Sequence, residues 1–242
     1  MTERRVVITA ASAITPIGHG QKPIVESLVN GKSGVATLRD DHFVSRFIHS
    51  RVYGTVGYPI EYDFSRQHRK TMGPVSYYAC QVAKEILEQA GLPRNFVTGG
   101  RLGIAFGSIH GSPTVQREIY RIFFNAGDRE SYQGIGAVVH TTAVNITKMF
   151  GITGRIISSG TACTTSSQSI GYGYEAVKYG LQDAMLCGGA DEYDTTTVAV
   201  FDNLLACSTA FNDRPEQTPR PFDRARDGLV VAEGAGAVML EE

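Results

Sequence analysis

A single cysteine stands where an apolar strand is expected to turn into a helix. It is Cys163, within the run Ser159–Ser167 (SGTACTTSS). Upstream, Arg155–Ser158 predicts a short strand. Downstream, Ser169–Tyr179 is long enough for about three helical turns, and Gly180 is a typical residue at a helix end. A strand, a tight turn and a helix in this order are typical of an α/β protein.

The position of Cys163 also carries a chemical implication. A thiol at a helix N-terminus lies near unpaired backbone N–H groups and the positive end of the helix dipole. Both favour the thiolate, which is the nucleophilic form, and the same N–H groups can stabilise an oxyanion on a bound thioester. Cys163 is therefore a candidate for covalent acyl transfer. The alternative is a small buried residue in a tight turn, because free cysteines are commonly core residues.

Bulk properties exclude several classes of protein. The chain has 242 residues, enough for one large domain or two small ones. Its formal net charge is -1, so no overall basic bias points to a nucleic acid. No run of about 18 apolar residues predicts a membrane span. The apolar run that begins at Val6 is too short for a signal-peptide core and predicts a first strand instead.

The cysteine pattern favours free thiols. The four cysteines form no C-x-x-C pair, and no histidine lies at metal-ligand spacing beside them; they are Cys80, Cys163, Cys187 and Cys207. So few cysteines in a chain of this length argue against a disulfide framework and for a reducing, cytoplasmic setting. We expect no metal. Cys80 and Cys187 are expected to be core residues within a helix and a strand, and Cys207 has no assigned role.

Predicted strands and helices alternate along the chain. Strands are predicted at Arg5–Thr9, Leu102–Phe106, Arg155–Ser158, Ala184–Cys187 and Ala235–Leu240. Further helices are predicted at Lys22–Asn30, Pro74–Ala90, 113–124 after an N-cap at Ser112, Thr141–Phe150 and Thr196–Ala206. This alternation implies a mostly parallel sheet with helices on its faces. Ligands in such sheets collect at the carboxyl ends of strands, where Gly107–Gly111 and Ser159–Cys163 are expected. Arg39–Ser65 predicts an irregular excursion.

Several motifs occur together and in order. They are Val6–Gly18 (VVITAASAITPIG), Gly107–Pro113 (GSIHGSP), Thr161–Gly171 (TACTTSSQSIG), Gly188–Glu192 (GGADE) and Arg220–Gly234 (RPFDRARDGLVVAEG). Across nearly the whole chain these residues resemble the N-terminal half of a beta-ketoacyl-acyl-carrier-protein synthase. The resemblance implies an α/β thiolase-like fold, with residues 1–242 as the N-terminal half of a duplicated, layered αβαβα architecture whose C-terminal half is absent.

The resemblance also implies a reaction. In that family the cysteine takes an acyl group from an acyl carrier protein, and a malonyl thioester then loses carbon dioxide to give an enolate. The enolate attacks the acyl-cysteine and extends a fatty-acid or polyketide chain. Cys163 matches the nucleophile. The family's implied partners are the acyl carrier protein, acyl and malonyl thioesters and a second subunit in a homodimer or heterodimer, and no metal or organic cofactor is implied.

Part of the family's catalytic set is not found in this sequence. Its two histidines and its lysine belong to the C-terminal half, and this chain stops before them. None of the chain's six histidines stands in the family's histidine motifs. His140 aligns with a non-catalytic position and is expected to be structural. His110 falls in the glycine-rich turn that lines the acyl pocket in the family, where its imidazole could narrow or polarise the pocket or simply bond to the backbone.

The remaining expected site residues are implied by the same matches. Substrate-binding positions are Gly107, Ile109, His110, Ala162 and Phe201, although a core role for Phe201 is nearly as well supported. The basic residues Arg66, Arg69 and Lys70 suggest a docking site for the acidic carrier protein. Alternatively, they form a solvated segment that leads into the next helix. Leu229 and Ala232 depart from the family's usual residues, without removing the nucleophile.

Two other functions stay open at this point. One is a non-catalytic partner subunit like the chain-length factors, which usually lack the cysteine that this chain retains. The other is a thioester hydrolase or acyltransferase that needs a nucleophile but no condensation. A lone half of the thiolase-like fold would expose a broad apolar face. We therefore expect the natural protein to continue past Glu242, or another chain to supply the second half.

Overall fold

The computed structural model describes residues 4–38, 48–124 and 134–242, which form two compact units. The first unit comprises the N-terminal segment up to Ile14, together with Ile60–Asp191 and Ala235–Glu242. The second comprises Thr15–Pro59 and Glu192–Gly234. Cys163 belongs to the first unit.

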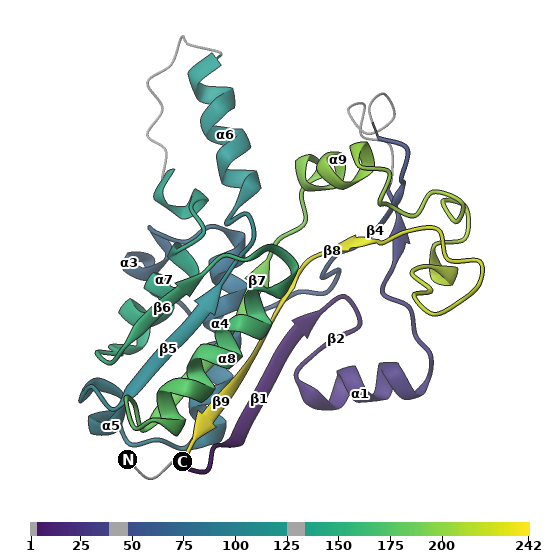
Figure 1. Ribbon diagram of the computed structural model, residues 1–242. Helices are drawn as coiled ribbons and strands as arrows, with labels where there is room; N and C mark the ends of the chain where they lie inside the picture. Colours follow the sequence, from purple (N-terminus) through teal and green to yellow (C-terminus); the bar gives the residue numbers. More distant parts are fainter. Residues whose placement is uncertain (1–3, 39–47, 125–133) are drawn as a thin grey trace. The chain divides into compact units, whose positions relative to one another are not determined.

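The first unit is built on a sheet whose strands lie in the order β1-β9-β7-β5-β6 (Figure 1). Their bounds are Val7–Thr15 for β1, Leu102–Gly107 for β5, Ile156–Ser159 for β6, Ala184–Asp191 for β7 and Gly234–Glu241 for β9. β5 pairs in parallel with both β6 and β7, whereas β1 and β9 are antiparallel. The predicted parallel sheet is therefore present around β5, with an antiparallel pair beside it.

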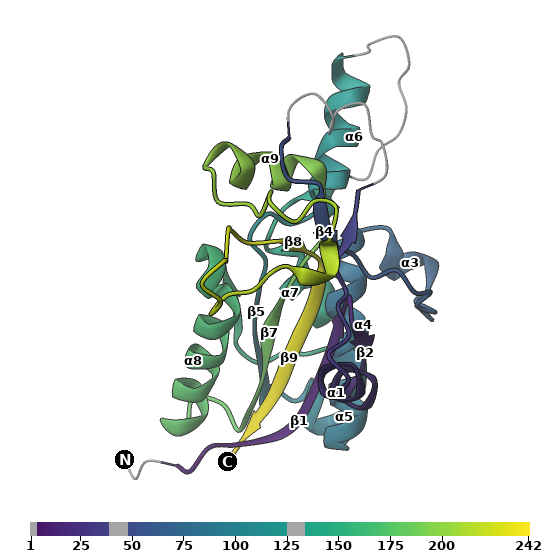
Figure 2. The same cartoon turned by 90° about the vertical axis from the view of Figure 1, so that its right-hand side faces the viewer.

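Helices cover both faces of this sheet. Figure 2 shows α8 (Thr165–Lys178) on one face and α4 (Pro74–Ala90) on the other. The helix α7 (Thr141–Phe150) packs beside α4 and contacts β5. The other helical segments of this unit are α3 (Arg66–Arg69), α5 (Arg94–Thr98), α6 (Pro113–Phe124) and the 3-10 turns η1 (Gly134–Ala137) and η2 (Ala162–Thr164).

The core of the first unit follows from the apolar pattern of its elements. All six residues of β5 are buried, and β7 is buried from Ala184 to Ala190. Continuous apolar runs of this kind are expected in strands that helices cover on both faces. α4 buries one face, formed by Val75, Ser76, Ala79, Cys80, Val82, Ala83 and Ile86. It ends as predicted, because Gly91 adopts the left-handed conformation at φ 62°.

The bounds of several elements differ from the sequence prediction: β1 runs to Thr15 and not to Thr9, and α9 ends at Asn203 and not at Ala206. Two further differences have contacts that explain them. α8 begins at Thr165 and not at Ser169, and the hydroxyl of Thr165 bonds back to the carbonyl of Ala162, which ties the start of the helix to η2. β7 continues past Cys187 to Asp191. Its glycines are not turn residues: a Cβ on Gly188 would lie 2.3 Å from the carbonyl oxygen of Gly236, so the neighbouring strand requires glycine there.

The second unit contains a small sheet of strand order β3-β4-β8, with bounds Ala36–Thr37, Val52–Gly54 and Val231–Ala232. Its other elements are β2 (Gly18–His19) and the helices α1 (Gln21–Val29) and α9 (Thr195–Asn203). Residues 39–65 were predicted to form an irregular excursion, of which residues 39–47 lie outside the described residues. The described part, residues 48–65, contains the short strand β4. Ile48, Val198, Cys207 and Val231 form an apolar cluster.

A buried carboxylate joins two segments of the second unit. Asp202 of α9 accepts hydrogen bonds from the backbone N–H groups of His49 at 3.0 Å and Ser50 at 2.9 Å. It also lies 2.9 Å from Nδ1 of His49. Burial alone would raise the pKa of Asp202, but these bonds outweigh burial and lower it. The ionised carboxylate therefore holds the segment that precedes β4 against α9.

Within the described part of the chain, no helix has the length and apolar character needed to cross a bilayer.

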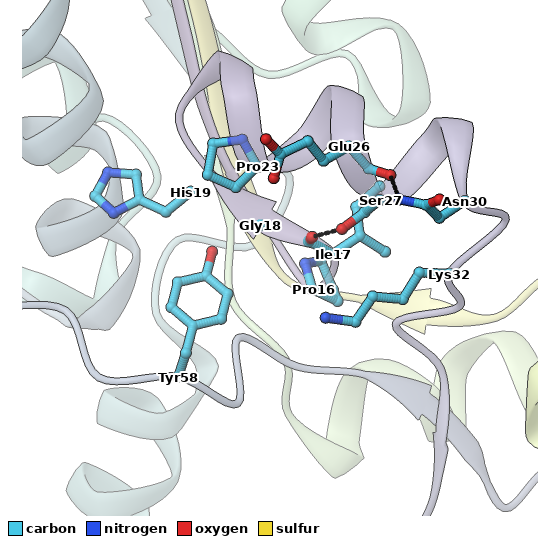
Figure 3. Close-up of a pocket in the computed structure, with 10 residues that line it drawn as sticks. All are labelled: Pro16, Ile17, Gly18, His19, Pro23, Glu26, Ser27, Asn30, Lys32 and Tyr58. Atoms are coloured by element: carbon cyan, nitrogen blue, oxygen red, sulfur yellow. Dashed lines mark hydrogen bonds between the residues drawn. The ribbon is translucent and has the colours of Figure 1, made fainter.

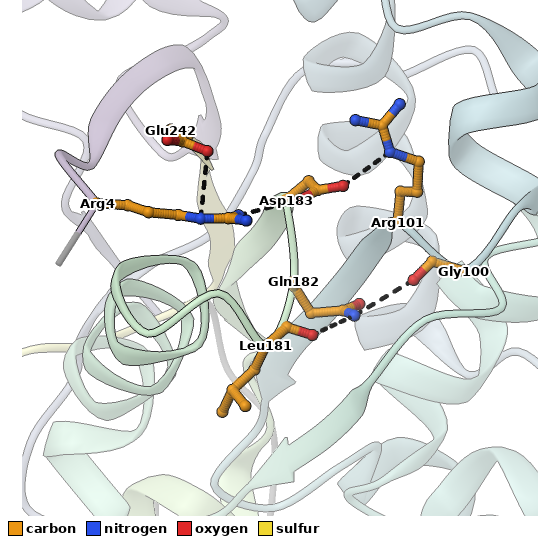
Figure 4. A network of polar contacts seen from close by, with 7 residues as sticks. All are labelled: Arg4, Gly100, Arg101, Leu181, Gln182, Asp183 and Glu242. Atoms are coloured by element: carbon orange, nitrogen blue, oxygen red, sulfur yellow. Dashed lines mark hydrogen bonds and ion pairs between the residues drawn. The ribbon is translucent and has the colours of Figure 1, made fainter. Parts of the chain in front are cut away.

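Charged side chains join the two ends of the chain to the start of β7 (Figure 4). Asp183 accepts a bond from Arg4 at 3.0 Å and one from Arg101 at 2.7 Å. Nε of Arg4 also lies 3.3 Å from a carboxylate oxygen of Glu242. The bonds from Arg101 and Arg4 lower the pKa of Asp183. Because the side chain of Asp183 is 35% exposed, solvent screens these contacts and their contribution to stability is modest.

Substituting Asp183→Asn is expected to lower the free energy of unfolding by about 1 kcal/mol at neutral pH. A depressed folded-state pKa means that the wild-type contribution is complete above the unfolded pKa of about 3.9 and is lost as the pH falls through the folded value. Urea unfolding at a series of pH values should show the two proteins converging in acid. An undiminished difference below about pH 3 would contradict this account.

Candidate active site

Cys163 lies in η2, between the end of β6 and the start of α8. Its thiol is exposed, whereas Cys80, Cys187 and Cys207 are buried. Burial raises the pKa of the Cys187 thiol to about 12 and that of Cys207 to about 11, and it raises the pKa of Cys80 further. Cys163 is therefore the cysteine of this chain that is placed to react with a molecule from solvent.

The turn that presents Cys163 contains a strained residue. Ala162 has a φ of 50°, in the left-handed region that residues with a Cβ avoid. Such a conformation costs on the order of 1 kcal/mol and persists only where surrounding contacts enforce it. Residues of this kind cluster at functional sites, and here the strained residue directly precedes the exposed thiol.

Buried hydroxyl groups enforce this turn. Oγ1 of Thr165 accepts a bond from the backbone N–H of Thr161 at 2.8 Å and donates to the carbonyl of Ala162 at 2.8 Å. Two serines extend this set of bonds. The hydroxyls of Ser159 and Ser169 lie 2.5 Å apart, and Ser169 also donates to the carbonyl of Thr165. Ser159, Thr165 and Ser169 are all buried, so the backbone next to the exposed cysteine is held by hydrogen bonds that water cannot easily replace.

Glycines let the supporting elements approach closely. Gly107, at the end of β5, lies opposite both Ser159 and Gly189 in the sheet register. A Cβ on Gly107 would lie 2.2 Å from the carbonyl oxygen of Ser159, and one on Gly189 would lie 2.2 Å from Oγ of Ser166. The carboxyl ends of β5 and β6 therefore lie side by side where the turn that carries Cys163 begins, and β7 pairs with β5 at the same level. The carboxyl ends of parallel strands are where ligands collect in such sheets.

The glycine-rich turn after β5 lies beside this turn. The carbonyl oxygen of Ser108 lies 3.9 Å from the position that a Cβ on Gly160 would take. Ile109 and His110, two predicted substrate-binding residues, are half-buried on this turn. Gly107 and Ala162 thus lie at the strand end and the turn around Cys163, and Ile109 and His110 lie on the turn that borders it. That these residues bind substrate, and that His110 narrows an acyl pocket, stay predictions.

The other predicted residues lie elsewhere in the chain. Phe201 belongs to the second unit, where it is half-buried against the cluster that contains Val198 and Cys207. Arg66, Arg69 and Lys70 lie on and just after α3, are exposed, and form no ion pair with any described residue. His140, predicted to be structural, is the N-cap residue of α7.

A separate hollow of about 510 Å³ lies within the second unit (Figure 3). Its lining includes His19, Glu26, Lys32 and Tyr58, and none of the predicted site residues. Several of its polar groups bond to the unit's own backbone, as Tyr58 does to the carbonyl of Thr15 at 2.8 Å. Across the described residues, no three His, Cys, Asp or Glu side chains are grouped as metal ligands would be.

Comparison with known proteins gives a consistent result. Residues 3–242 match the family model described as "Beta-ketoacyl synthase, N-terminal domain". The chain is 32% identical over 246 residues to 3-oxoacyl-[acyl-carrier-protein] synthase 2 of Vibrio cholerae, and 32% identical over 245 residues to 3-oxoacyl-[acyl-carrier-protein] synthase 1 of Haemophilus influenzae. These matches cover 100% and 99% of the chain but only 59% of each relative.

Solved structures show the same fold. A crystal structure of a beta-ketoacyl synthase from Burkholderia phymatum superposes with a TM-score of 0.89 at 38% identity, over 100% of this chain and 59% of that one. The ishigamide ketosynthase/chain length factor superposes with a TM-score of 0.83 at 24% identity, over 99% of this chain and 58% of that one, a likeness that bears on the fold alone. The thiolase-like α/β fold predicted from the sequence is confirmed.

Iodoacetamide is expected to alkylate Cys163 in the native protein before any of the other cysteines, because their thiols are buried and protonated. Intact-mass spectrometry with peptide mapping measures this. Cys163→Ser should take up no label when folded but should be labelled at its three remaining cysteines in urea. Native labelling at Cys80 or Cys187 would show that the assigned burial is wrong.

Thr165→Val keeps the shape of the side chain but removes both hydroxyl bonds, leaving the N–H of Thr161 without its acceptor. We expect a loss of about 1–3 kcal/mol in the free energy of unfolding and slower alkylation of Cys163. Thr165→Ser, which retains the hydroxyl, is the matched control and should stay close to wild type in both measurements. If Thr165→Val also behaved as wild type, the hydroxyl would not be what holds the turn.

Proposed function

The chain belongs to the beta-ketoacyl synthase family through its N-terminal domain, and from this premise we propose that the protein is a 3-oxoacyl-[acyl-carrier-protein] synthase with Cys163 as nucleophile. One observation carries the proposal. The exposed thiol of Cys163 follows a strained residue on a turn held by buried hydroxyls, at the head of α8. A turn built in this way presents a nucleophile to a substrate.

The first step is transfer of an acyl group to Cys163. The thiolate attacks the carbonyl carbon of an acyl thioester, a C–S bond forms, and the carbonyl oxygen becomes an oxyanion. Cys163 lies just before the start of α8, so the positive end of the helix dipole would stabilise that oxyanion, and the N-cap residue Thr164 places no side-chain bond on it. Collapse of the intermediate breaks the C–S bond to the carrier, whose thiolate takes up the proton that Cys163 gave up.

The second step is condensation. A malonyl thioester loses carbon dioxide, and the electron pair of the broken C–C bond forms an enolate. The enolate carbon then attacks the acyl-cysteine, the bond from Sγ of Cys163 to the acyl carbon breaks, and a 3-ketoacyl thioester leaves. The groups that stabilise the enolate in the family belong to its C-terminal half, and this chain spans 59% of the curated relatives it matches. We expect those groups to come from a second half.

Apolar side chains on the outer side of α8 support a second half. Ile170, Tyr172 and Tyr174 are 37%, 41% and 44% exposed. An amphipathic helix that covers a sheet normally leaves polar residues outward, so this face favours burial by a further domain. We propose that a similar half, in the same chain or in another, packs against it.

The acyl carrier protein is the proposed source of the acyl group. Arg66, Arg69 and Lys70 leave three positive charges free to attract an acidic partner, since no described residue pairs with them. Association of two subunits is proposed through β6, which is an edge strand with Ile156 49% exposed. We place the reaction in the cytoplasm, where an exposed thiol stays reduced.

Two other functions compete with this proposal. A non-catalytic partner subunit would have no use for an exposed thiol on a strained turn, so Cys163 opposes that alternative. A hydrolase or simple acyltransferase needs the thiol but no condensation. It predicts that the acyl group leaves to water or another acceptor without becoming longer.

We expect the complete protein to gain the mass of one acyl group when it is incubated with an acyl-carrier-protein thioester, and we expect Cys163→Ala to gain none. Intact-mass spectrometry measures the adduct. Adding malonyl-carrier protein should then discharge it as a 3-ketoacyl product. Discharge as the free acid would favour a hydrolase, and a folded wild-type protein that takes up no acyl group would favour a non-catalytic partner.

A further inference from the structure

Asp191, the last residue of β7, holds the glycine-rich turn that follows β5. Its Oδ1 accepts a bond from Oγ of Ser108 at 2.8 Å and one from the backbone N–H of Ile109 at 2.8 Å. Oγ of Ser108 in turn accepts a bond from the N–H of Gly111 at 2.9 Å. The carboxylate of Asp191 thus accepts hydrogen bonds from this turn directly, and it reaches the N–H of Gly111 indirectly through Ser108.

The carboxylate of Asp191 is half-buried, and this partial removal from water strengthens the bonds that it accepts. Burial raises the pKa of Asp191, and the bonds from Ile109, Ser108 and His110 offset that effect only in part. Moving the turn would remove donors from a partly desolvated acceptor, which costs more than breaking a fully exposed hydrogen bond. The side chain of Ser108 is itself fully buried, so water has little access to replace the lost bonds.

The far end of the turn is fixed as well. Gly111 has a φ of 69°, and a Cβ there would lie 2.3 Å from the carbonyl oxygen of Ala137. The next residue, Ser112, is fully buried and accepts a bond from the N–H of Val75 through its Oγ at 3.3 Å. Only the middle of the turn, which carries the half-buried Ile109 and His110, faces outward.

The position of this middle section depends on Asp191. The turn lies beside the segment that leads to Cys163, since the carbonyl oxygen of Ser108 is 3.9 Å from the Cβ position of Gly160. Ile109 and His110 directly follow Ser108, so this contact places them on a turn that borders the segment leading to Cys163. A side chain held by a bonded turn discriminates between chain lengths more sharply than one on a free loop.

We propose that Asp191 is a positioning residue: it fixes the turn that carries Ile109 and His110 beside the segment leading to Cys163, and thereby sets which acyl-chain lengths the cysteine accepts. This inference rests on the proposed synthase function. In this role Asp191 contacts neither the reacting sulfur nor the acyl carbon. It acts through the turn 108–111. Its carboxylate accepts hydrogen bonds from Ser108 and Ile109, and Ser108 accepts one from Gly111.

The test measures acylation of Cys163 in the complete protein with butanoyl, octanoyl and hexadecanoyl thioesters of the carrier protein. Wild type should show a preferred length. In Asp191→Ala the ratio of rate constants between preferred and disfavoured chains should fall by about tenfold. Asp191→Asn should keep most of the preference, because its side-chain oxygen can still accept from Ser108 and Ile109.

Asp183→Asn is the matched control, since Asp183 directly precedes the opposite end of β7 and its partners are arginines. It should leave the length preference unchanged. Alkylation by iodoacetamide, which has no acyl chain, reports whether Cys163 remains reactive in each variant. If Asp191→Ala does not fold, Ser108→Ala removes the relay to Gly111 while keeping the carboxylate, and it should also weaken the preference.

The outcomes separate the two proposals. A folded wild type that takes up no acyl group from any thioester contradicts the proposed function itself. A wild type that is acylated with a length preference, together with an Asp191→Ala or Ser108→Ala variant whose preference is unaltered, contradicts the role of Asp191 alone. An equal loss of preference in Asp191→Asn and Asp191→Ala would also contradict it, because the bonds to the turn would then not be the cause.

Discussion

The close approach of α8 to the strands β5 and β7 is the contact on which the rest of the first unit depends. It is possible only where side chains are missing. A Cβ on Gly173 of α8 would lie 2.1 Å from Sγ of Cys187 in β7. Glycine inside a helix costs roughly 1 kcal/mol relative to alanine. Close packing of the helix on a buried strand offsets that cost. The same packing positions the start of α8, and with it Cys163, near the carboxyl ends of the strands.

The site combines an exposed thiol, which can react, with buried hydrogen-bonding groups, which hold its backbone in place. The thiol of Cys163 must be reachable, yet the backbone that carries it is strained at Ala162 and would relax without restraint. Buried hydrogen-bonding groups supply the restraint, because a desolvated bond is expensive to break. The buried Thr165 restrains the turn that carries Cys163, and the half-buried Asp191, with the buried Ser108, restrains the glycine-rich turn alongside.

The parts of the fold that could be predicted from the sequence are those with a strong local signal. α4 has the predicted bounds because its apolar residues recur at helical spacing and Pro74 and Gly91 mark its ends. β5 was predictable as a continuous apolar run. The start of α8 and the end of β7 were not, since Thr165 bonds to its own turn and Gly188 is required by a neighbouring strand. Neither contact has a signature in the local pattern.

Sequence alone determined that Cys163 follows a strand and precedes a helix, and that its motifs resemble those of a condensing-enzyme family, because strand, turn and helix signals are local. It did not determine that Asp191 bonds to Ser108 and Ile109, which lie 83 and 82 residues away. Only the tertiary structure decided this. Parallel pairing of β5 with β7 places their carboxyl ends together, and an acceptor on one strand then meets the donors that follow the other.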